Sequence, residues 1–127
     1  MKNEQSSRVA SVWVGDDGIC RVIHAPDVEV TLQDAQETMA AYRKLNNGKR
    51  LPLLIDMKTM RAISRDARHF YASEEAAECA CAAAILVGTP VSRVLGNFYI
   101  GLSNPYLPSK LFTSEDEALA WLKEFVA

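Results

Sequence analysis

Basic and hydroxyl side chains gather where one apolar run ends and the next predicted helix begins. Asp56 closes the run, Lys58, Arg61 and Ser64 follow it, and Arg68 lies one helical turn beyond Ser64. Cations beside a helix start attract anions, because free backbone N–H groups and the helix dipole favour negative charge there. The pattern is compatible with a small anion-binding site. The favoured alternative is a solvated loop and helix face, since neighbouring aspartates partly neutralise the cations.

Ser64 has two interpretations that do not exclude each other. Serine is a preferred helix N-cap, because its side-chain oxygen accepts a hydrogen bond from a free backbone N–H. A hydroxyl at this place is also a candidate phosphoacceptor, because a phosphate at a positive helix end changes how a partner docks. The cap is the favoured interpretation, and a capping hydroxyl can still be modified.

A second polar group follows the most apolar run of the chain. Thr89, Ser92 and Arg93 begin the next predicted helix. In open α/β sheets, ligands bind in the crevice at the carboxyl ends of the strands. We therefore expect this group to face Arg61 and Ser64 across such a crevice, which is the preferred candidate site for a ligand or a partner.

Cysteines and histidines offer no assembled centre. Cys79 and Cys81 share a face if their segment is extended, and Cys20 and His24 share one on the second predicted strand. Zinc needs four convergent ligands, and no motif brings four together, so we predict buried structural cysteines, no metal and no cofactor. His69 is tied to no nucleophile by any motif. The sequence therefore predicts a protein that is not an enzyme.

Composition excludes several classes of protein. Fourteen Lys and Arg against sixteen Asp and Glu give a net charge of −2, which leaves no basic excess for a nucleic-acid backbone. The longest apolar stretch is far shorter than the roughly 20 residues of a membrane span. The polar N-terminus lacks the apolar core of a secretory signal, and the odd set of cysteines suits a reducing compartment. We expect a cytoplasmic protein with free thiols.

The elements that must position these residues alternate between strands and helices. Periodicity, caps and turn residues predict, in order, strands at 8–15 and 19–24, a helix at 32–45 capped by Thr31, a strand at 51–57, a helix from 64, a strand at 82–88, a helix after 90 that ends at 104–105, a strand at 109–113 and a helix from 114. The second helix ends near residue 73 or continues to residue 79.

This order, ββαβαβαβα with four helices, predicts an α/β fold with a mixed sheet. The opening hairpin supplies the antiparallel part, and the later strands are parallel, because crossovers are right-handed. We expect one domain at residues 8–126 and a flexible tail at residues 1–7. The third helix is predicted to bury Val91, Val94, Leu95, Phe98 and Leu102, which recur at helical spacing.

The opposite face of that third helix carries small residues. Gly96 and Gly101 flank Asn97 and Ile100 there. Two interpretations remain open: the face packs against the sheet edge or the last helix, or it receives a partner. The last helix is predicted to dock through Leu119, Trp121, Leu122 and Phe125.

The strings LLIDM, ISRDAR, LGNFYIGLSNP and LFTSEDEALAWL, in this order of elements, resemble a group of small bacterial STAS-like (SpoIIAA-like) proteins of unassigned function. The superfamily includes anti-sigma-factor antagonists and is related in shape to CRAL-TRIO lipid-binding domains. The resemblance implies a phosphorylatable serine or threonine after an aspartate, at the helix that follows the third strand. Ser64 lies within about one position of that acceptor, but Arg65 stands beside it and the Asp-Ser pair is absent.

The resemblance favours a regulatory or protein-interaction module that forms a homodimer or binds a protein partner. The alternative is a small carrier that binds an apolar or anionic ligand in the crevice at the strand carboxyl ends. A small enzyme that uses Ser64, His69 and Arg61 ranks last, because the spacing does not imply the geometry it needs.

Overall fold

The computed structural model describes residues 4–102 and 107–126. In chain order its elements are β1 (Glu4–Ser6), β2 (Ala10–Val14), β3 (Cys20–His24), β4 (Glu29–Val30), α1 (Leu32–Leu45), β5 (Leu51–Asp56), β6 (Ala62–Ile63), α2 (Arg65–Tyr71), α3 (Glu74–Ala77), β7 (Ala80–Leu86), α4 (Pro90–Leu102), β8 (Ser109–Phe112), α5 (Glu115–Leu122) and a 3₁₀ turn, η1 (Lys123–Phe125).

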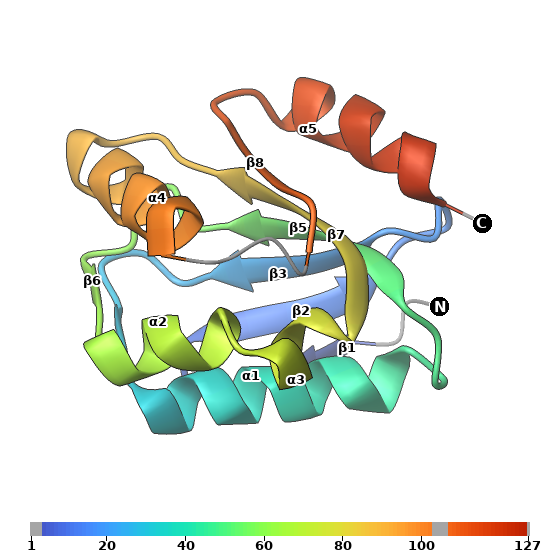
Figure 1. Cartoon of the computed structure of the whole chain (residues 1–127), viewed down its shortest axis with the longest axis horizontal. Coiled ribbons are helices and arrows are strands. Elements are labelled where there is room, and N and C mark those ends of the chain that lie inside the picture. The colour runs from blue at the N-terminus through green and yellow to red at the C-terminus, as the bar shows by residue number, and fades with distance from the viewer. Residues whose placement is uncertain (1–3, 103–106, 127) are drawn as a thin grey trace.

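Six of these strands form one mixed sheet in the order β1-β2-β3-β5-β7-β8 (Figure 1). The pairs β1–β2 and β2–β3 are antiparallel, and the pairs β3–β5, β5–β7 and β7–β8 are parallel. The predicted mixed sheet, with an opening hairpin followed by parallel strands, is confirmed. Strands β4 and β6 pair separately and parallel to each other.

Helices cover both faces of the sheet. Residues of α1, α2 and α3 pack with alternate residues of β3 and β7, such as Val22 and Ile85, in one core. On the other face, Ala118 and Leu122 of α5 pack on Leu54 and its neighbours, with Trp121 beside them. The predicted docking of the last helix is confirmed. The alternation of side chains along each strand therefore supplies two separate cores.

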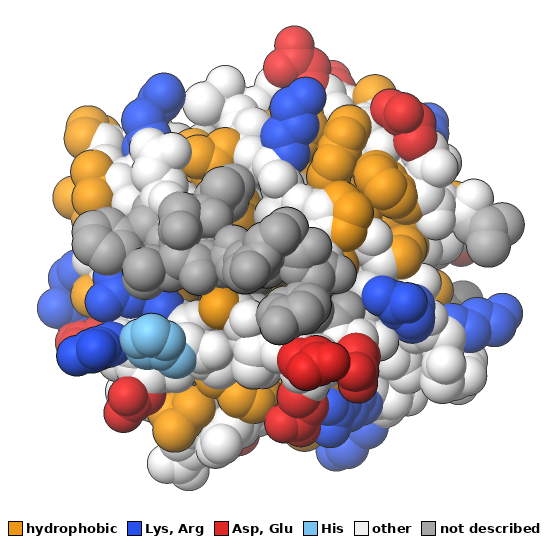
Figure 2. Space-filling model, in the orientation of Figure 1, with side chains coloured by type: hydrophobic (Ala, Val, Ile, Leu, Met, Phe, Trp, Pro, Cys, Tyr) orange, Lys and Arg blue, Asp and Glu red, His pale blue; other side chains and the backbone are white. Residues whose placement is uncertain are grey.

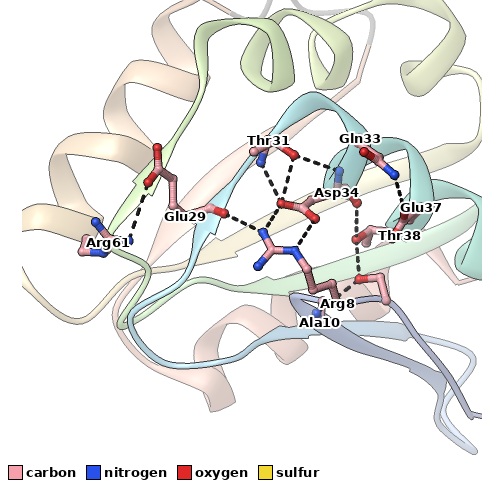
Figure 3. Close-up of polar contacts among 10 residues, drawn as sticks. Arg8, Ala10, Glu29, Thr31, Gln33, Asp34, Glu37, Thr38 and Arg61 are labelled. Atoms are coloured by element: carbon pink, nitrogen blue, oxygen red, sulfur yellow. Dashed lines mark hydrogen bonds and ion pairs between the residues drawn. The ribbon is translucent and has the colours of Figure 1, made fainter.

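A polar cluster fixes the start of α1 against the first strands (Figure 3). Thr31 accepts a hydrogen bond from the Asp34 backbone N–H, and the Asp34 carboxylate accepts one from the Thr31 N–H, which completes a capping box. The Arg8 Nε donates to the same carboxylate over 2.9 Å. These bonds hold the pKa of Asp34 at about 2, chiefly through the Arg8 hydrogen bond.

Residues 4–6 correct the prediction of a flexible tail over residues 1–7. They form β1, in which Gln5 pairs with Val12 of β2, and residues 1–3 lie outside the described chain. The Ser7 hydroxyl then meets the Thr38 hydroxyl of α1 at 2.9 Å. A polar strand at a sheet edge gains its order from backbone pairing, so hydrophobic alternation does not reveal it.

The predicted second helix is two helices in the structure, so the described chain holds five α-helices rather than four. Ser73 separates α2 from α3: its hydroxyl donates to the Phe70 carbonyl at 2.6 Å and accepts from the Ala76 N–H at 3.2 Å. A serine that caps a new helix ends the old one, because its backbone is extended rather than helical.

The predicted buried stripe of α4 is wrong at its start. Val91 and Val94 are 53% and 58% exposed, whereas Ser92 and Gly96 face inward. A Cβ on Gly96 would lie 2.7 Å from Leu111 Cδ2 of β8. The glycine therefore lets the helix approach the sheet edge on its small face, which favours the packing interpretation of that face. Phe98, Ile100, Gly101 and Leu102 lie outside the described side chains.

Candidate functional site

The loops after β5 and β7 meet at the carboxyl edge of the sheet, as the sequence predicts. The Asp56 carboxylate accepts a hydrogen bond from the Lys58 backbone N–H at 3.1 Å, and the Lys58 ammonium lies 3.4 Å from it. The Lys58 side chain lies against Gly88, where an added Cβ would be 3.2 Å from its Cβ. This contact joins the two loops through the aliphatic stem of Lys58.

Thr89 and Ser92 hold the start of α4. The Ser92 hydroxyl accepts from the Gly88 and Thr89 N–H groups at 3.0 and 2.9 Å and lies 3.1 Å from the Thr89 carbonyl, to which it donates. The Thr89 hydroxyl accepts from the Ser92 N–H. Ser92 is completely buried, so its hydroxyl serves the local backbone.

The remaining predicted site residues go to different places. Ser64 caps α2 by accepting from the Ala67 N–H at 3.1 Å. Arg61 lies near the carboxylates of Asp27 and Glu29, at 3.5 and 3.6 Å. Arg68 is partly buried on α2, and Arg93 lies in an open groove between α4 and β8 together with Lys110 and Glu117. The eight residues are therefore spread over separate local structures.

A different feature lies on the α1 face of the sheet, where the structure has an apolar pocket. The space open to the centre of a water-sized sphere is about 70 Å³. Alternate residues of β3, β5 and β7 form its floor, and α1, α3 and neighbouring segments form its walls. Its described lining is Val22, His24, Thr38, Met39, Tyr42, Leu53, Ile55, Ile63, Tyr71, Ala76, Ala83, Ile85 and Leu107.

Small residues explain why this pocket is open. Ala83 lies in the middle of β7 with no exposed surface, between Leu53 of the adjacent strand β5 and Ser109 of β8. Ala76 of α3 is also buried and also lines the pocket. An alanine at each position removes the side-chain volume that a valine or leucine would supply to a close-packed core.

His24 is the residue of the described pocket lining whose ordinary pKa, 6.5, lies nearest to neutral pH, and it is 9% exposed. Its Nδ1 lies 3.0 Å from the backbone carbonyl oxygen of Asp56, which only accepts, so Nδ1 carries the proton. Burial lowers the pKa of His24, although the hydrogen bond and charge of Asp56 oppose this shift. The imidazole is therefore neutral near pH 7, and Nε2 is an acceptor.

Nε2 of His24 is buried and has no hydrogen-bond partner among the described residues. The hydroxyls of Thr38 and Tyr42, which also line the pocket, are engaged. The Thr38 hydroxyl donates to the Asp34 carbonyl at 2.9 Å. The Tyr42 hydroxyl donates to the Cys79 carbonyl and accepts from the Leu51 N–H. His24 Nε2 is thus a buried acceptor without a described partner, in a residue that lines a largely apolar pocket.

Sequence reasoning placed Cys20 and His24 on one face but looked there for zinc. In the structure both face the same core, and Cys20 is completely buried. Within the described residues, no group of three His, Cys, Asp or Glu side chains could hold a metal ion. The sequence signal that could have indicated the pocket is a histidine, His24, at the end of a strand face whose other residues, Cys20 and Val22, are apolar.

The comparisons with other proteins support the fold. Residues 12–126 match the family Domain of unknown function (DUF7793). The structure is similar to that of an uncharacterised protein from the DUF3478 family, with a SpoIIAA-like fold, from Shewanella loihica PV-4: 16% identity, TM-score 0.56, covering 96% of this chain and 92% of that one. The SpoIIAA-like fold predicted from the sequence is confirmed.

A crystal structure of a protein with unknown function from Arthrobacter sp. FB24 is 35% identical, covers 87% of this chain and 90% of that one, and has a TM-score of 0.35. No curated protein matches the chain. None of the described helices is long and apolar enough to cross a membrane.

Proposed function

This chain belongs to the DUF7793 family, and from that premise we propose that it is a non-catalytic binding module that holds a small apolar ligand in the pocket beside His24. The observation that carries the proposal is the buried Nε2 acceptor of His24, which has no described partner and belongs to a residue that lines a largely apolar pocket. Native proteins rarely leave a buried polar atom without a partner, because doing so costs about 1 to 3 kcal/mol. A bound molecule would supply the partner.

The engaged polar groups support a non-catalytic function. Ser64, Thr89 and Ser92 cap helices. His69 is exposed and its Nε2 lies 3.4 Å from Arg65 Nε. A nucleophile needs a base within hydrogen-bond reach, and no described contact joins a hydroxyl or thiol to either histidine.

Titration with a small apolar probe tests this function. Toluene or phenol, added to methyl-labelled protein, is expected to give saturable NMR shifts at Leu53, Ile55 and Ile85. Ala83→Val fills the pocket and is expected to weaken that binding at least about tenfold, since the space is lost to the added methyl groups. The exposed Ala120→Val on α5 serves as the matched control. The absence of saturable shifts with both probes would contradict the proposal.

A regulatory or protein-interaction function, with self-association of the chain, is the second candidate. The outward face of α4 favours it: Val91 and Val94 are both more than half exposed, and hydrophobic side chains reach the surface over α4 at the left edge of Figure 2. A second copy of the same patch would cover these valines in a two-fold dimer.

Sedimentation velocity tests the second candidate. If the chain dimerises through α4, Val94→Glu is expected to yield monomers, because a carboxylate would be buried in the interface. Val126→Glu places the same change at another exposed valine and is expected to leave the dimer intact. A wild-type chain that stays monomeric at high concentration would exclude self-association.

The expected setting of either function is the bacterial cytoplasm, without nucleic acid as a partner. The net charge of −2 supports the exclusion of nucleic acid. Fractionation of the source cells and a salt-dependent DNA-binding assay are the corresponding checks. Recovery of the protein with DNA at physiological salt would contradict this assignment.

A further inference from the structure

We propose that the ligand of the His24 pocket is a neutral, largely apolar molecule with one hydrogen-bond donor, such as the hydroxyl of an alcohol or phenol, which donates to His24 Nε2. This inference rests on the proposed function and adds the chemical class of the ligand. It follows from three features of the pocket: the direction of the His24 hydrogen bond, the occupied state of the neighbouring polar groups, and the size of the space.

The direction of the His24 hydrogen bond decides what the ligand must offer. A backbone carbonyl cannot donate, so the 3.0 Å contact with the Asp56 carbonyl oxygen fixes the proton on Nδ1. Nε2 then carries a lone pair, and its best partner is a donor. A ligand ether or carbonyl oxygen at this place would face Nε2 as a second acceptor, with no hydrogen between the two atoms.

The surroundings disfavour a charged ligand. A carboxylate or phosphate in the pocket would need donors, but the hydroxyls of Thr38 and Tyr42 already donate to backbone carbonyls. The charge of Asp56 acts on the His24 ring and would repel an anion there. A cation would lose its hydration against apolar walls, which costs several kcal/mol without a paired charge. A neutral donor satisfies Nε2 without these penalties.

The size of the pocket limits the apolar part of the ligand. The pocket's 70 Å³ is about half of the roughly 150 Å³ of an engineered cavity that holds benzene. The enclosed space therefore accepts a group smaller than a ring, or the hydroxyl end of a ring whose remainder extends beyond the described lining.

Phenol and toluene form a matched probe pair, because they have nearly the same shape and only phenol has a donor. We expect phenol to bind about tenfold more tightly, the ratio that one net hydrogen bond to a buried acceptor gives. Benzoate, which has the same ring with a negative charge, is expected to bind more weakly than either. Equal affinities for phenol and toluene, or tighter binding of benzoate, would overturn the inference.

A wrong donor requirement and a wrong binding function give different results. If toluene and phenol bind equally, the pocket takes ligands and only the donor requirement is wrong. If neither probe binds, the proposed function itself is wrong and the inference falls with it. His24→Phe removes the acceptor and is expected to bring the two affinities together, whereas His69→Phe on α2 is the control that keeps the tenfold difference. The wild-type comparison stands without these variants if His24→Phe does not fold.

Discussion

The His24 imidazole donates from Nδ1 to the Asp56 backbone carbonyl over 3.0 Å, which joins the carboxyl ends of β3 and β5. Nδ1 is thereby used in the fold, and Nε2 is buried without a described partner. The same bond fixes the tautomer of His24, so the geometry of two neighbouring strands determines the chemistry of the pocket.

The buried state of His24 predicts a pH dependence of stability. The pKa of His24 lies below its ordinary value of 6.5 in the folded chain, mainly because of burial. Below pH 6.5 the unfolded chain therefore binds more protons, so the free energy of unfolding falls as the pH falls. This contribution is complete above pH 6.5. The charge of Asp56 acts on the ring, and the Lys58 ammonium is paired with that carboxylate.

Urea unfolding from about pH 7 to about pH 5 measures this effect. His24→Phe is expected to flatten the slope in that range, and the exposed His69→Phe is expected to retain it. A wild-type unfolding free energy that does not change between these pH values would contradict a buried, neutral His24.

Asp34 predicts a second loss of stability, at lower pH. Its pKa of about 2 lies below the ordinary 3.8 because Arg8 and Thr31 bind the carboxylate. The resulting stability is present above pH 3.8 and is lost as the pH falls toward about 2. Asp34→Asn is expected to remove this part of the acid transition, while Glu37→Gln, on the exposed side of α1, leaves it in place. Identical acid transitions in wild type and Asp34→Asn would contradict this role.

The three cysteines are expected to react in a fixed order. Burial raises the pKa of Cys20 to about 12 and also raises the pKa of Cys81, and only the thiolate is nucleophilic. Cys79 is partly exposed. Mass spectrometry after brief iodoacetamide treatment should find Cys79 modified first and Cys20 only after unfolding. Labelling of Cys20 before unfolding would contradict this order, because it would show that reagent reaches the core around Cys20 in the folded protein.

The orientation of α4 is tested by a pair of substitutions. Gly96→Ala would place a Cβ 2.7 Å from Leu111 and 3.0 Å from Val87, and such overpacking costs about 1 to 3 kcal/mol. Val94→Ala changes an exposed residue and is expected to alter stability by less than about 0.5 kcal/mol. Urea unfolding of both variants measures this. If Val94→Ala were more destabilising than Gly96→Ala, the buried stripe predicted from the sequence would be correct and the observed orientation of α4 wrong.

Local signals in the sequence predicted much of the fold. The Thr31 cap and the turn at 46–48 gave the bounds of α1, which the structure places at Leu32–Leu45. The apolar runs gave the central strands. Other features depend on contacts between distant residues and leave no local pattern. The strand at Glu4–Ser6 is polar, and the inward face of α4 is decided by the approach of Gly96 to β8.

The candidate site was harder to predict than the fold. Residue types indicated the carboxyl edge of the sheet, and the loops there do meet, but their hydroxyls serve as helix caps. The pocket depends on Ala76 and Ala83, which lie on different elements. A small side chain creates a space only when its neighbours fail to fill it, and a single sequence does not show those neighbours. Sequence reasoning therefore singled out His24 as a possible zinc ligand and not as a residue of an apolar pocket.

Nitrogen NMR of the two histidines, without and with phenol, reports both the protonation of His24 and the response of its Nε2 to a hydrogen-bond donor. His69→Gln identifies which signals belong to His24. Near neutral pH the account predicts that His24 carries its proton on Nδ1, that Nε2 is unprotonated, and that phenol shifts the Nε2 signal in the direction of an accepted hydrogen bond, with little change at His69. A proton on Nε2 in the free protein, or an Nε2 signal unmoved by saturating phenol, would contradict it.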